Sequence, residues 1–417
     1  MTGYDRENLG RNCTTIKNAN QMLIVEEIRR NGQMSRSDLA KKLQLSNPSV
    51  SKNIEDLERR NIIKTTGSAI TEVGRRPIML HFNKDCGCVG AINFSHSDGV
   101  RVCLANMDGE PFELAHFETN TPINKKMVDW SIETLHTLLK KYYIRRGELR
   151  CICIACPGVV DPHDGNLVFA LRFEGYDSLD FKDVFFKEFN VPVLVKNDMN
   201  LAASGEHSFG VGKGFSNLMY INIGLGIGSG LILNDQFFEG TYGFAGEMGV
   251  VETPPAQGHS YDIATDDAFK LLNHEISLYA MTNHIVKRFD DGEPTWLRER
   301  VQKSEEITVE LIIEAVKNND PLCCEIVKNS ARMLAKLLVN INQILDLGLF
   351  IIAGLIAQFG EIYLNEIRKR FSQTLLYSNV RIAFGELGDL AATYGAIELA
   401  SKTAISMLVE QYSERDA

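Results

Sequence analysis

One order of short apolar runs occurs twice in this chain, and it constrains the fold more than any other feature of the sequence. The runs of the first copy are residues 88–94, 100–107 and 112–117, and those of the second are 218–223, 230–233 and 236–238. Helical segments and further apolar runs follow each copy. We therefore expect two similar α/β lobes built on a duplicated plan, with a small-ligand site in the cleft between them.

The length of 417 residues exceeds what one core needs and suits two lobes with a small extra domain. The longest apolar stretches, 219–233 and 349–355, are short or broken by Gly and Asn. Both fall below the roughly 20 residues that a membrane helix needs. Residues 1–13 are polar and lack the apolar centre of a signal peptide. We expect a cytoplasmic protein with no membrane partner.

Charge is distributed unevenly along the chain. Residues 1–80 contain 14 Lys and Arg against 9 Asp and Glu, a net charge of +5. Since the whole chain has a net charge of −10, the remaining residues carry −15. A basic N-terminal region on an acidic body indicates a polyanion partner for that region alone, although chance asymmetry would also produce it. The nine cysteines in a chain without a signal peptide favour reduced thiols. Cys151, Cys153 and Cys156 are interpreted as core residues, because no His or Cys cluster follows at zinc spacing.

The N-terminal region has the pattern of three short helices. Apolar residues between 22 and 28 form a helical stripe that ends at Asn31-Gly32. Ser35 has the character of an N-cap, with Asp38 three residues later, and opens a helix to Leu43. After a tight turn, Ser46 caps a third helix that runs to about residue 60. This is the helix-turn-helix arrangement.

The third helix carries the predicted base-reading residues. Val50, Ile54 and Leu57 form its buried side. Residues expected to face outward in its N-terminal half, toward a major groove, are Asn47, Ser49, Ser51, Lys52 and Asn53. We also assign Ser35 and Arg36, at the start of the second helix, to DNA contact. A merely solvated helix face is the alternative.

A wing follows the three helices. Residues 62–65 and 78–82 are two β-like runs, joined by a polar loop that contains Gly74-Arg75-Arg76-Pro77. Two strands with a basic tip are typical of a winged helix-turn-helix. Arg75 and Arg76 suit a narrow, electronegative minor groove, so double-stranded DNA is the predicted partner.

With these features in place, residues 17–405 resemble the ROK family, which groups bacterial sugar kinases with sugar-responsive repressors. The resemblance rests on seven segments in family order: Met34 to Leu57, Gly74-Arg75-Arg76-Pro77, Cys156-Pro157-Gly158-Val159-Val160-Asp161, Lys196-Asn197-Asp198-Met199-Asn200, Gly224-Leu225-Gly226-Ile227-Gly228-Ser229-Gly230, Gly246-Glu247-Met248-Gly249 and Gly388 to Ala396. It implies an N-terminal α/β winged helix-turn-helix, followed by a two-lobed α/β actin-like ATPase fold of the ribonuclease H-like, sugar-kinase class. We divide the chain into a DNA-binding domain (1–82), a first lobe (83–205) and a second lobe (206–417) that includes a helical dimerisation region.

The phosphate side of the kinase pattern is missing. Family kinases have an Asp-x-Gly-Gly-Thr turn after the first strand, where the carboxylate organises the metal nucleotide. This chain has Asn93-Phe94-Ser95-His96-Ser97 there, with one extra residue. The carboxylate is gone and side chains fill the phosphate space, so we expect no ATP cofactor and no kinase activity. The glycine turn 224–230 is kept, but such a turn is also typical of a hairpin.

The sugar side is better kept. Asn197 and Asp198 end an apolar strand and precede a helix, which places them where α/β clefts bind ligands. The resemblance implies that Asp198 accepts a hydrogen bond from a sugar hydroxyl with the help of Asn197, and that Glu247 and Gly158 also line the site. A helix cap is the alternative for Asn197-Asp198, and the two roles are compatible.

The zinc loop of the family is absent. Val250 stands in place of its histidine, and residues 253–260 contain no cysteine, so we expect no structural zinc. The resemblance matches Asp262 to the glutamate that follows that loop and so implies that Asp262 belongs to the effector site. The remaining C-terminal residues are predicted to be helical, over 276–288, 308–318, 321–344, 360–371 and 390–410, with a frayed tail at 413–417.

Together the patterns predict a homodimeric repressor that binds a pseudo-palindromic operator and changes its affinity when a sugar or sugar phosphate binds. Two alternatives stay open. One is a carbohydrate kinase with an accessory DNA-binding region. The other is a regulator controlled by a protein partner, which the altered Val250 and the missing zinc loop favour.

Overall fold

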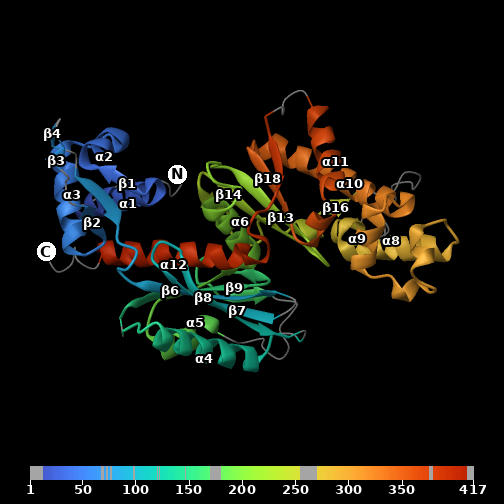
Figure 1. Cartoon of the computed structure of the whole chain (residues 1–417), viewed down its shortest axis with the longest axis horizontal. Coiled ribbons are helices and arrows are strands. Elements are labelled where there is room, and N and C mark those ends of the chain that lie inside the picture. Colours follow the sequence, from blue (N-terminus) through green and yellow to red (C-terminus); the bar gives the residue numbers. More distant parts are fainter. Residues whose placement is uncertain are drawn as a thin grey trace, which may run out of the picture. The chain divides into compact units, whose positions relative to one another are not determined.

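The computed structural model of the chain is shown in Figure 1. It describes residues 13–410 except 67–69, 72–73, 76–77, 97–98, 120, 122, 146, 170–179, 254–269 and 375–378. Contacts divide the chain into two compact units: residues 1–154, 173–195 and 396–417 form the first, and 155–172 and 196–395 form the second. Compared with our division from sequence, residues 155–172 and 196–205 join the second unit and 396–417 join the first.

The first unit begins with the three predicted helices, α1 (Cys13–Asn31), α2 (Arg36–Leu43) and α3 (Asn47–Arg59). Both predicted N-caps are confirmed, since Ser35 accepts a hydrogen bond from the Asp38 amide and Ser46 accepts one from the Ser49 amide. Each bond satisfies a backbone donor that the first helical turn leaves free. Fully buried Ile24, Val25 and Ile28 of α1 and Val50, Ile54 and Leu57 of α3 form the core of this region.

A small sheet completes the DNA-binding region. The predicted strands are present as β2 (Ile63–Thr66) and β5 (Met79–Phe82), and they pair antiparallel. Two features were not predicted. Strand β1 (Gln33–Ser35) adds to the other side of β5, and β3 (Ile70–Thr71) pairs with β4 (Gly74–Arg75) as a hairpin within the wing. Strands of two or three residues are too short to show an alternating pattern.

The first copy of the repeat forms a five-stranded sheet with the order β12-β9-β6-β7-β8. Its strands are β6 (Cys88–His96), β7 (Gly99–Asn106), β8 (Pro111–Glu118), β9 (Leu149–Cys156) and β12 (Val193–Asn197). Helix α4 (Lys125–Lys141) packs against β7 and β8 (Figure 1), and α5 (Phe181–Phe189) precedes β12. Cys151, Cys153 and Cys156 are free thiols with no exposed surface, which agrees with their interpretation as core residues.

The second copy forms a sheet of equivalent order, β15-β14-β13-β18-β19. Its strands are β13 (Leu218–Ile223), β14 (Ile227–Leu233), β15 (Gln236–Phe237), β18 (Leu349–Ala353) and β19 (Arg381–Phe384). In both sheets three consecutive strands form an antiparallel meander, and two later strands extend the sheet beside the first of them. The predicted duplication is therefore confirmed.

Helices supply most of the rest of the second unit. They are α6 (Asp198–Phe209), α7 (Asn273–Ile276), α8 (Leu278–Asp290), α9 (Val309–Lys317), α10 (Pro321–Leu345) and α11 (Glu361–Ser372). The last helix, α12 (Ala391–Glu410), begins in the second unit and continues into the first. The predicted C-terminal helices correspond to α8 to α12. Buried Ile221 and Phe350 of the sheet pack with Leu334, Leu338 and Tyr363 of α10 and α11 in one apolar core.

Short elements connect these parts. They are β10 (Val159–Val160), β11 (Leu167–Phe169), β16 (Glu252–Thr253), β17 (Lys270–Leu271) and the single-turn helices η1 (Met248–Val250), η2 (Trp296–Glu299), η3 (Ser304–Glu306), η4 (Leu355–Phe359) and η5 (Gly388–Leu390). Among the described residues, no helix is long and apolar enough to cross a membrane.

Candidate functional site

The exposed surface of α3 is the candidate DNA interface. Pro48 occupies its first turn, and the apolar residues of α3 are turned into the core. Asn47 and Lys52 are exposed, and Ser49 and Ser51 are half-buried. These four polar side chains therefore lie at or near the surface of the N-terminal half of the helix, as predicted for a recognition helix.

Asn53 does not face outward, so that prediction is wrong. Its side chain is 5% exposed, and its amide Nδ2 donates to the Ser49 carbonyl over 3.0 Å. Residues at spacings of three and four share one side of a helix, and Asn53 lies three positions after Val50 and four before Leu57. It therefore packs on the buried side. The spacing of the apolar residues already contained this information.

Ser35 caps the start of α2, and Arg36 links α2 to α3. Ser35 is 3% exposed, and its Oγ donates to the Asp38 carboxylate over 2.7 Å. Its hydroxyl is committed to the start of α2, which contradicts its assignment to DNA contact. Arg36 is half-buried, with Nη2 3.4 Å from a carboxylate oxygen of Glu58 on α3. The predicted wing arginines are less fully described: the backbone of Arg75 lies in β4, paired with Ile70, and Arg76 lies outside the described residues.

The candidate effector site is built around the junction of β12 and α6. Asn197 is the N-cap of α6, and its Oδ1 accepts hydrogen bonds from the amides of Met199 and Asn200, over 2.9 and 3.0 Å. Its Nδ2 donates to the carbonyl of Gly158 over 2.8 Å. Asn197 therefore does cap a helix, as the alternative interpretation predicted. The same side chain fixes Gly158, another predicted site residue, against the start of α6.

Asp198 follows at the first position of α6 and is 5% exposed. Its Oδ1 accepts from the Met199 amide over 3.0 Å. Burial, and secondarily the negative charge of Asp198, raises the pKa of the Cys156 thiol. The pKa of Tyr220 is raised by burial first, with smaller effects of Glu206 and Asp198. Both neighbours are thus kept neutral at pH 7, and the Asp198 side chain lies in a confined, weakly solvated position.

Glu247 lies at the start of η1, on a segment packed against the sheet and against β10. Ser229 of β14 donates to the carbonyl of Gly246 over 2.6 Å. A Cβ on Gly243 would lie 2.3 Å from the Val160 carbonyl oxygen, so only glycine permits this approach. Gly243, at φ +80°, therefore brings the segment that carries Glu247 close to the strand that follows Gly158.

The Glu247 carboxylate is available to a ligand. The side chain is half-buried, and burial raises its pKa. Within the described part of the chain, its carboxylate has no hydrogen-bond or ion-pair partner. A partly buried acceptor without a partner gains from a donor such as a sugar hydroxyl. Val250, three residues on, is 61% exposed, and Asp262 lies outside the described residues.

Two further polar residues near this site escaped the sequence analysis. Asn200 is 3% exposed, and its Oδ1 has no hydrogen-bond partner among the residues that the structure describes. The Oδ1 of Asn273 is likewise buried and unpartnered, 3.6 Å from where a Cβ on Gly226 would lie. Asn200 could have been found, because it lies within the segment 196–200. Asn273 follows an undescribed stretch and carries no local signal.

The two segments that correspond to the glycine turns of family kinases, residues 93–96 and 224–230, differ. In the first sheet, Asn93 has no exposed surface, and its Oδ1 accepts from the amide of Ser95, over 2.9 Å, and from the Ser95 hydroxyl. The pairing of β6 with β7 shifts register between Asn93 and His96, where we counted an extra residue. In the second sheet, the Gly224 amide donates to the Gly226 carbonyl over 2.9 Å, and Leu225 between them is 58% exposed.

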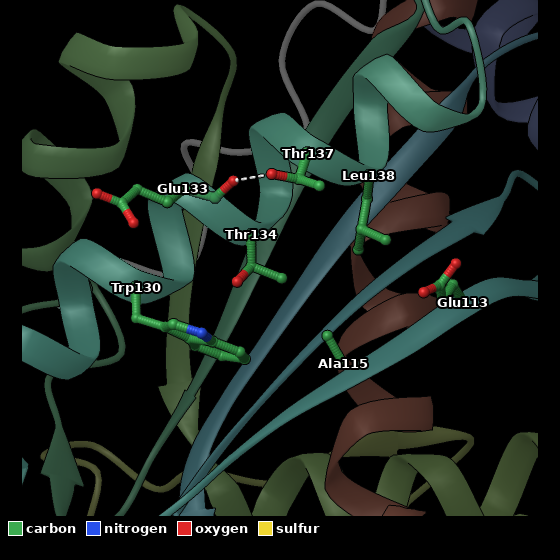
Figure 2. A pocket seen from close by; sticks show the side chains of 7 residues that line it. All are labelled: Glu113, Ala115, Trp130, Glu133, Thr134, Thr137 and Leu138. Carbon is green, nitrogen blue, oxygen red and sulfur yellow. Dashed lines mark hydrogen bonds between the residues drawn. The ribbon is translucent and has the colours of Figure 1, made fainter.

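A separate groove of about 310 Å³ lies between α4 and β8. Figure 2 shows the groove lined by Trp130, Thr134 and Thr137 of α4 and by Glu113 and Ala115 of β8. The Thr137 hydroxyl donates to the Glu133 carbonyl within α4, over 2.8 Å. The groove is open and contains none of the predicted site residues. Asp198 and Glu247, which both belong to the second unit, therefore remain the candidate effector residues.

Comparisons with known proteins agree with this picture. Residues 97–403 match the family model described as ROK family, and residues 17–64 match a winged helix-turn-helix DNA-binding model. A protein of Caldicellulosiruptor bescii named xylose repressor is 26% identical over 401 residues, which cover 95% of this chain and 98% of that protein.

Solved structures share the fold. A crystal structure described as a ROK family transcriptional regulator, homolog of the E. coli MLC protein, has a TM-score of 0.78 at 21% identity and covers 95% of this chain and 99% of its own. A ROK family glucokinase from Streptomyces griseus, in complex with glucose and AMPPNP, has a TM-score of 0.59 at 22% identity and covers 75% and 99%. The glucokinase match thus extends over three quarters of the chain.

Proposed function

This chain belongs to the ROK family and carries a winged helix-turn-helix DNA-binding region, and from these premises we propose that it is a sugar-responsive transcriptional repressor. We propose that it acts in the cytoplasm as a homodimer on an operator with two half-sites. A single helix-turn-helix reads only one half-site, so two copies related by a two-fold axis match a palindromic operator.

One observation carries this proposal: residues that match the sugar-binding part of a kinase site are kept, whereas residues that match its phosphate-binding part are not. Asp198 and Glu247 offer buried or half-buried carboxylates to a polyhydroxylated ligand. The turn at Asn93 has an amide in place of a carboxylate, and its polar groups bond to one another. A site that keeps sugar acceptors and lacks a metal-phosphate turn supports binding without phosphoryl transfer. We therefore propose that the chain is not an enzyme and uses no ATP or zinc.

D-Xylose is the first effector to test, because the Caldicellulosiruptor relative is named xylose repressor. A neutral sugar also fits the charges of the site. Lys196, next to Asn197, is 15% exposed and bonds both oxygens of Glu239, at 3.0 and 2.9 Å. Because Glu239 neutralises this cation, the carboxylates of Asp198 and Glu247 would repel a phosphate. A free sugar should therefore bind more tightly than its phosphate ester.

For DNA contact we propose the four polar residues at the surface of α3, together with the wing. Asn47, Ser49 and Ser51 can bond base edges, and Lys52 can reach phosphate. Arg75 and Arg76 of the wing would enter the minor groove. The buried Asn53 and Ser35 have no place in this interface.

The test is fluorescence anisotropy of a labelled duplex from the region upstream of the chain's own gene, with and without sugar. The panel contains D-xylose, D-glucose, N-acetyl-D-glucosamine and the phosphate esters of these sugars. Tight operator binding that D-xylose or another free sugar weakens would support the proposal. The Glu252→Ala variant, which removes an exposed carboxylate five residues from Glu247, should respond like the wild type.

Three outcomes would contradict the proposal. Absence of DNA binding would remove the repressor function. Steady ATP-dependent phosphorylation of a sugar in a coupled assay would instead identify a kinase with an accessory DNA-binding region. If DNA binding is tight but no sugar in the panel changes it, control by a protein partner becomes the better explanation.

A further inference from the structure

A buried ion cluster in the first unit joins three distant segments. Arg29 of α1 is 10% exposed in its side chain, and its Nε lies 3.2 Å from the carboxylate of Asp108, in the turn between β7 and β8. Its Nη2 lies 3.0 Å from the carboxylate of Glu398, on α12, which is 9% exposed. The Arg29 guanidinium thus links α1 both to the β7–β8 turn and to the last helix.

Other groups complete this cluster. Lys402, one turn further along α12, places Nζ 3.2 Å from Glu398. The Arg29 guanidinium also lies over the ring of Phe82, 5.5 Å from its centre. Burial alone would raise the pKa of Glu398, but Arg29 and Lys402 outweigh it and lower that pKa. Glu398 is therefore charged at neutral pH.

A second contact links α12 to the recognition helix. Arg60, the C-cap of α3, donates from Nη1 to the carbonyl of Val409 over 2.7 Å. The same nitrogen donates to Oε1 of Gln21 on α1 over 3.2 Å. The C-terminal half of α12 therefore touches both α1 and the end of α3. A shift of α12 would move the polar side chains of α3 with it.

The opposite end of α12 packs against α6, within the second unit. A Cβ on Gly395 would lie 1.8 Å from the Leu201 carbonyl oxygen, and a Cβ on Gly205 would lie 2.1 Å from the Ala391 carbonyl oxygen. The two helices therefore meet backbone to backbone, without side chains to absorb a displacement. The first turn of α6 carries Asp198 and the Asn197 cap of the effector site.

We propose that α12 transmits effector binding to the DNA-binding region, with Arg29 and Glu398 as the positioning residues at its far end. This inference rests on the proposed repressor function and names its regulation. A helix of 20 residues is about 30 Å long. Its N-terminal end responds to any displacement of α6, and its C-terminal end fixes the direction of α1 and α3.

A structural clamp is the competing explanation, and it differs in its consequences. A buried ion pair adds little net stability relative to apolar residues of the same volume, and its role in some proteins is to specify one arrangement. If Arg29 and Glu398 only stabilise the fold, their loss lowers the melting temperature and leaves the sugar response intact. If they position the DNA-binding region, their loss uncouples sugar binding from operator affinity.

The test compares the wild type with Glu398→Gln, using labelled upstream DNA and D-xylose. Coupling between two sites commonly changes affinity by roughly 5- to 150-fold. We expect the factor by which D-xylose changes the operator Kd to fall to less than about twofold in Glu398→Gln. The Kd for D-xylose itself, measured by calorimetry on the free protein, should stay within about twofold of wild type.

Two further variants serve as a control and as an independent test. Glu27→Gln, also on α1, removes the partner of Lys42 within the DNA-binding region and does not touch α12, so it should keep the wild-type sugar response. Arg60→Met removes the bonds to Val409 and Gln21 and also the charge that acts on Asp56. It should lower the sugar response even if Glu398→Gln fails to fold, which circular dichroism would reveal.

The outcomes separate this inference from the proposed function. A wild-type protein that ignores upstream DNA or D-xylose would contradict the proposed function with this effector. If D-xylose changes the operator Kd by the same factor in the wild type, Glu398→Gln and Arg60→Met, the role of α12 is overturned and the proposed function stands. Amide hydrogen exchange tests the role of α12 without sugar. DNA binding should change the exchange rates of residues 396–410 in the wild type. Unchanged rates there would also overturn the role of α12.

Discussion

The two five-stranded sheets have the same strand order, and their first hairpins have opposite character. Near the end of β6, Asn93 is fully buried and bonds Ser95 beside a register shift. At the β13–β14 turn, a Cβ on Gly224 would meet no atom of the described residues within 4 Å. The polar groups at the end of β6 bond to one another, whereas the second turn leaves open space.

Under the proposed function, this difference is how a duplicated kinase-like fold becomes a sensor. The strand order and the core are set by apolar packing, which does not depend on the residues in the turns. We propose that the altered segment at Asn93 removes phosphoryl transfer, while the acceptors at Asp198 and Glu247 remain. The two copies can therefore diverge separately, and each prediction below tests one side of that divergence.

The largest effect is expected for Asp198→Ala, on the side that has kept its ligand groups. A hydrogen bond to a charged group contributes about 1.5–3 kcal/mol, so sugar affinity should fall by about one to two orders of magnitude. Induction should be lost at sugar concentrations that release the wild type, while operator affinity without sugar is unchanged. Titration calorimetry and DNA anisotropy measure the two quantities. Normal induction of this variant would show that the effector site lies elsewhere.

Glycine-to-alanine substitutions compare the packing of the two sheets. A Cβ on Gly230 in β14 would lie 2.3 Å from the Met199 carbonyl oxygen, so backbone must move. Gly230→Ala should lower the free energy of unfolding by about 1–3 kcal/mol. On Gly90 in β6, the nearest atoms are side-chain carbons of Ile152 and Leu135 at 3.3 Å, and Gly90→Ala should cost less. Urea denaturation decides, and a greater loss for Gly90→Ala would contradict this ordering.

A smaller, pH-dependent effect is expected at Glu247. Burial raises its pKa, so the carboxylate is lost on acidification at a higher pH than for an ordinary glutamate. Sugar affinity should be constant near neutral pH and should decline as the pH falls toward this raised pKa, by no more than about tenfold. Glu247→Gln should flatten the dependence. Calorimetry at stepped pH tests this, and an identical decline in the variant would exclude Glu247 as the cause.

For Asn93→Asp we expect no change in kinase activity, which is the smallest effect of the four. Asn93→Asp restores a carboxylate to the altered segment, but Ser95 and the register shift remain. No phosphoryl transfer to D-xylose or D-glucose should appear in a coupled ATP assay. Any sustained turnover by this variant would show that the turn is a single substitution from function and that the two sheets differ less than we conclude.

Local signals in the sequence predicted much of the fold. The caps at Ser35, Ser46 and Asn197, and the strands of both repeats, depend on neighbouring residues and could be placed. Asn53 was misplaced because its polarity was given more weight than its spacing from Val50 and Leu57. The short strand β1 has too few residues to show a period.

Contacts between distant segments lay beyond the sequence. Arg29 and Glu398 are 369 residues apart, and no pattern in either helix indicates that they pair. The Asn273 Oδ1, which has no hydrogen-bond partner in the described part of the chain, also depends on tertiary approach to Gly226. The family resemblance predicts the positions of Asp198 and Glu247. Their burial, and the lack of a partner for the Glu247 carboxylate among the described residues, come only from the structure.

The central claim, that one chain couples operator binding to sugar binding, is tested most directly by reciprocity. Thermodynamic linkage requires that, if D-xylose weakens operator binding by some factor, operator DNA weakens D-xylose binding by the same factor. Calorimetric titration of D-xylose into the free protein and into the operator-saturated protein measures this. We predict a Kd that is higher on the DNA complex by the factor seen in DNA anisotropy. Equal Kd values for the free and DNA-bound protein would contradict the account.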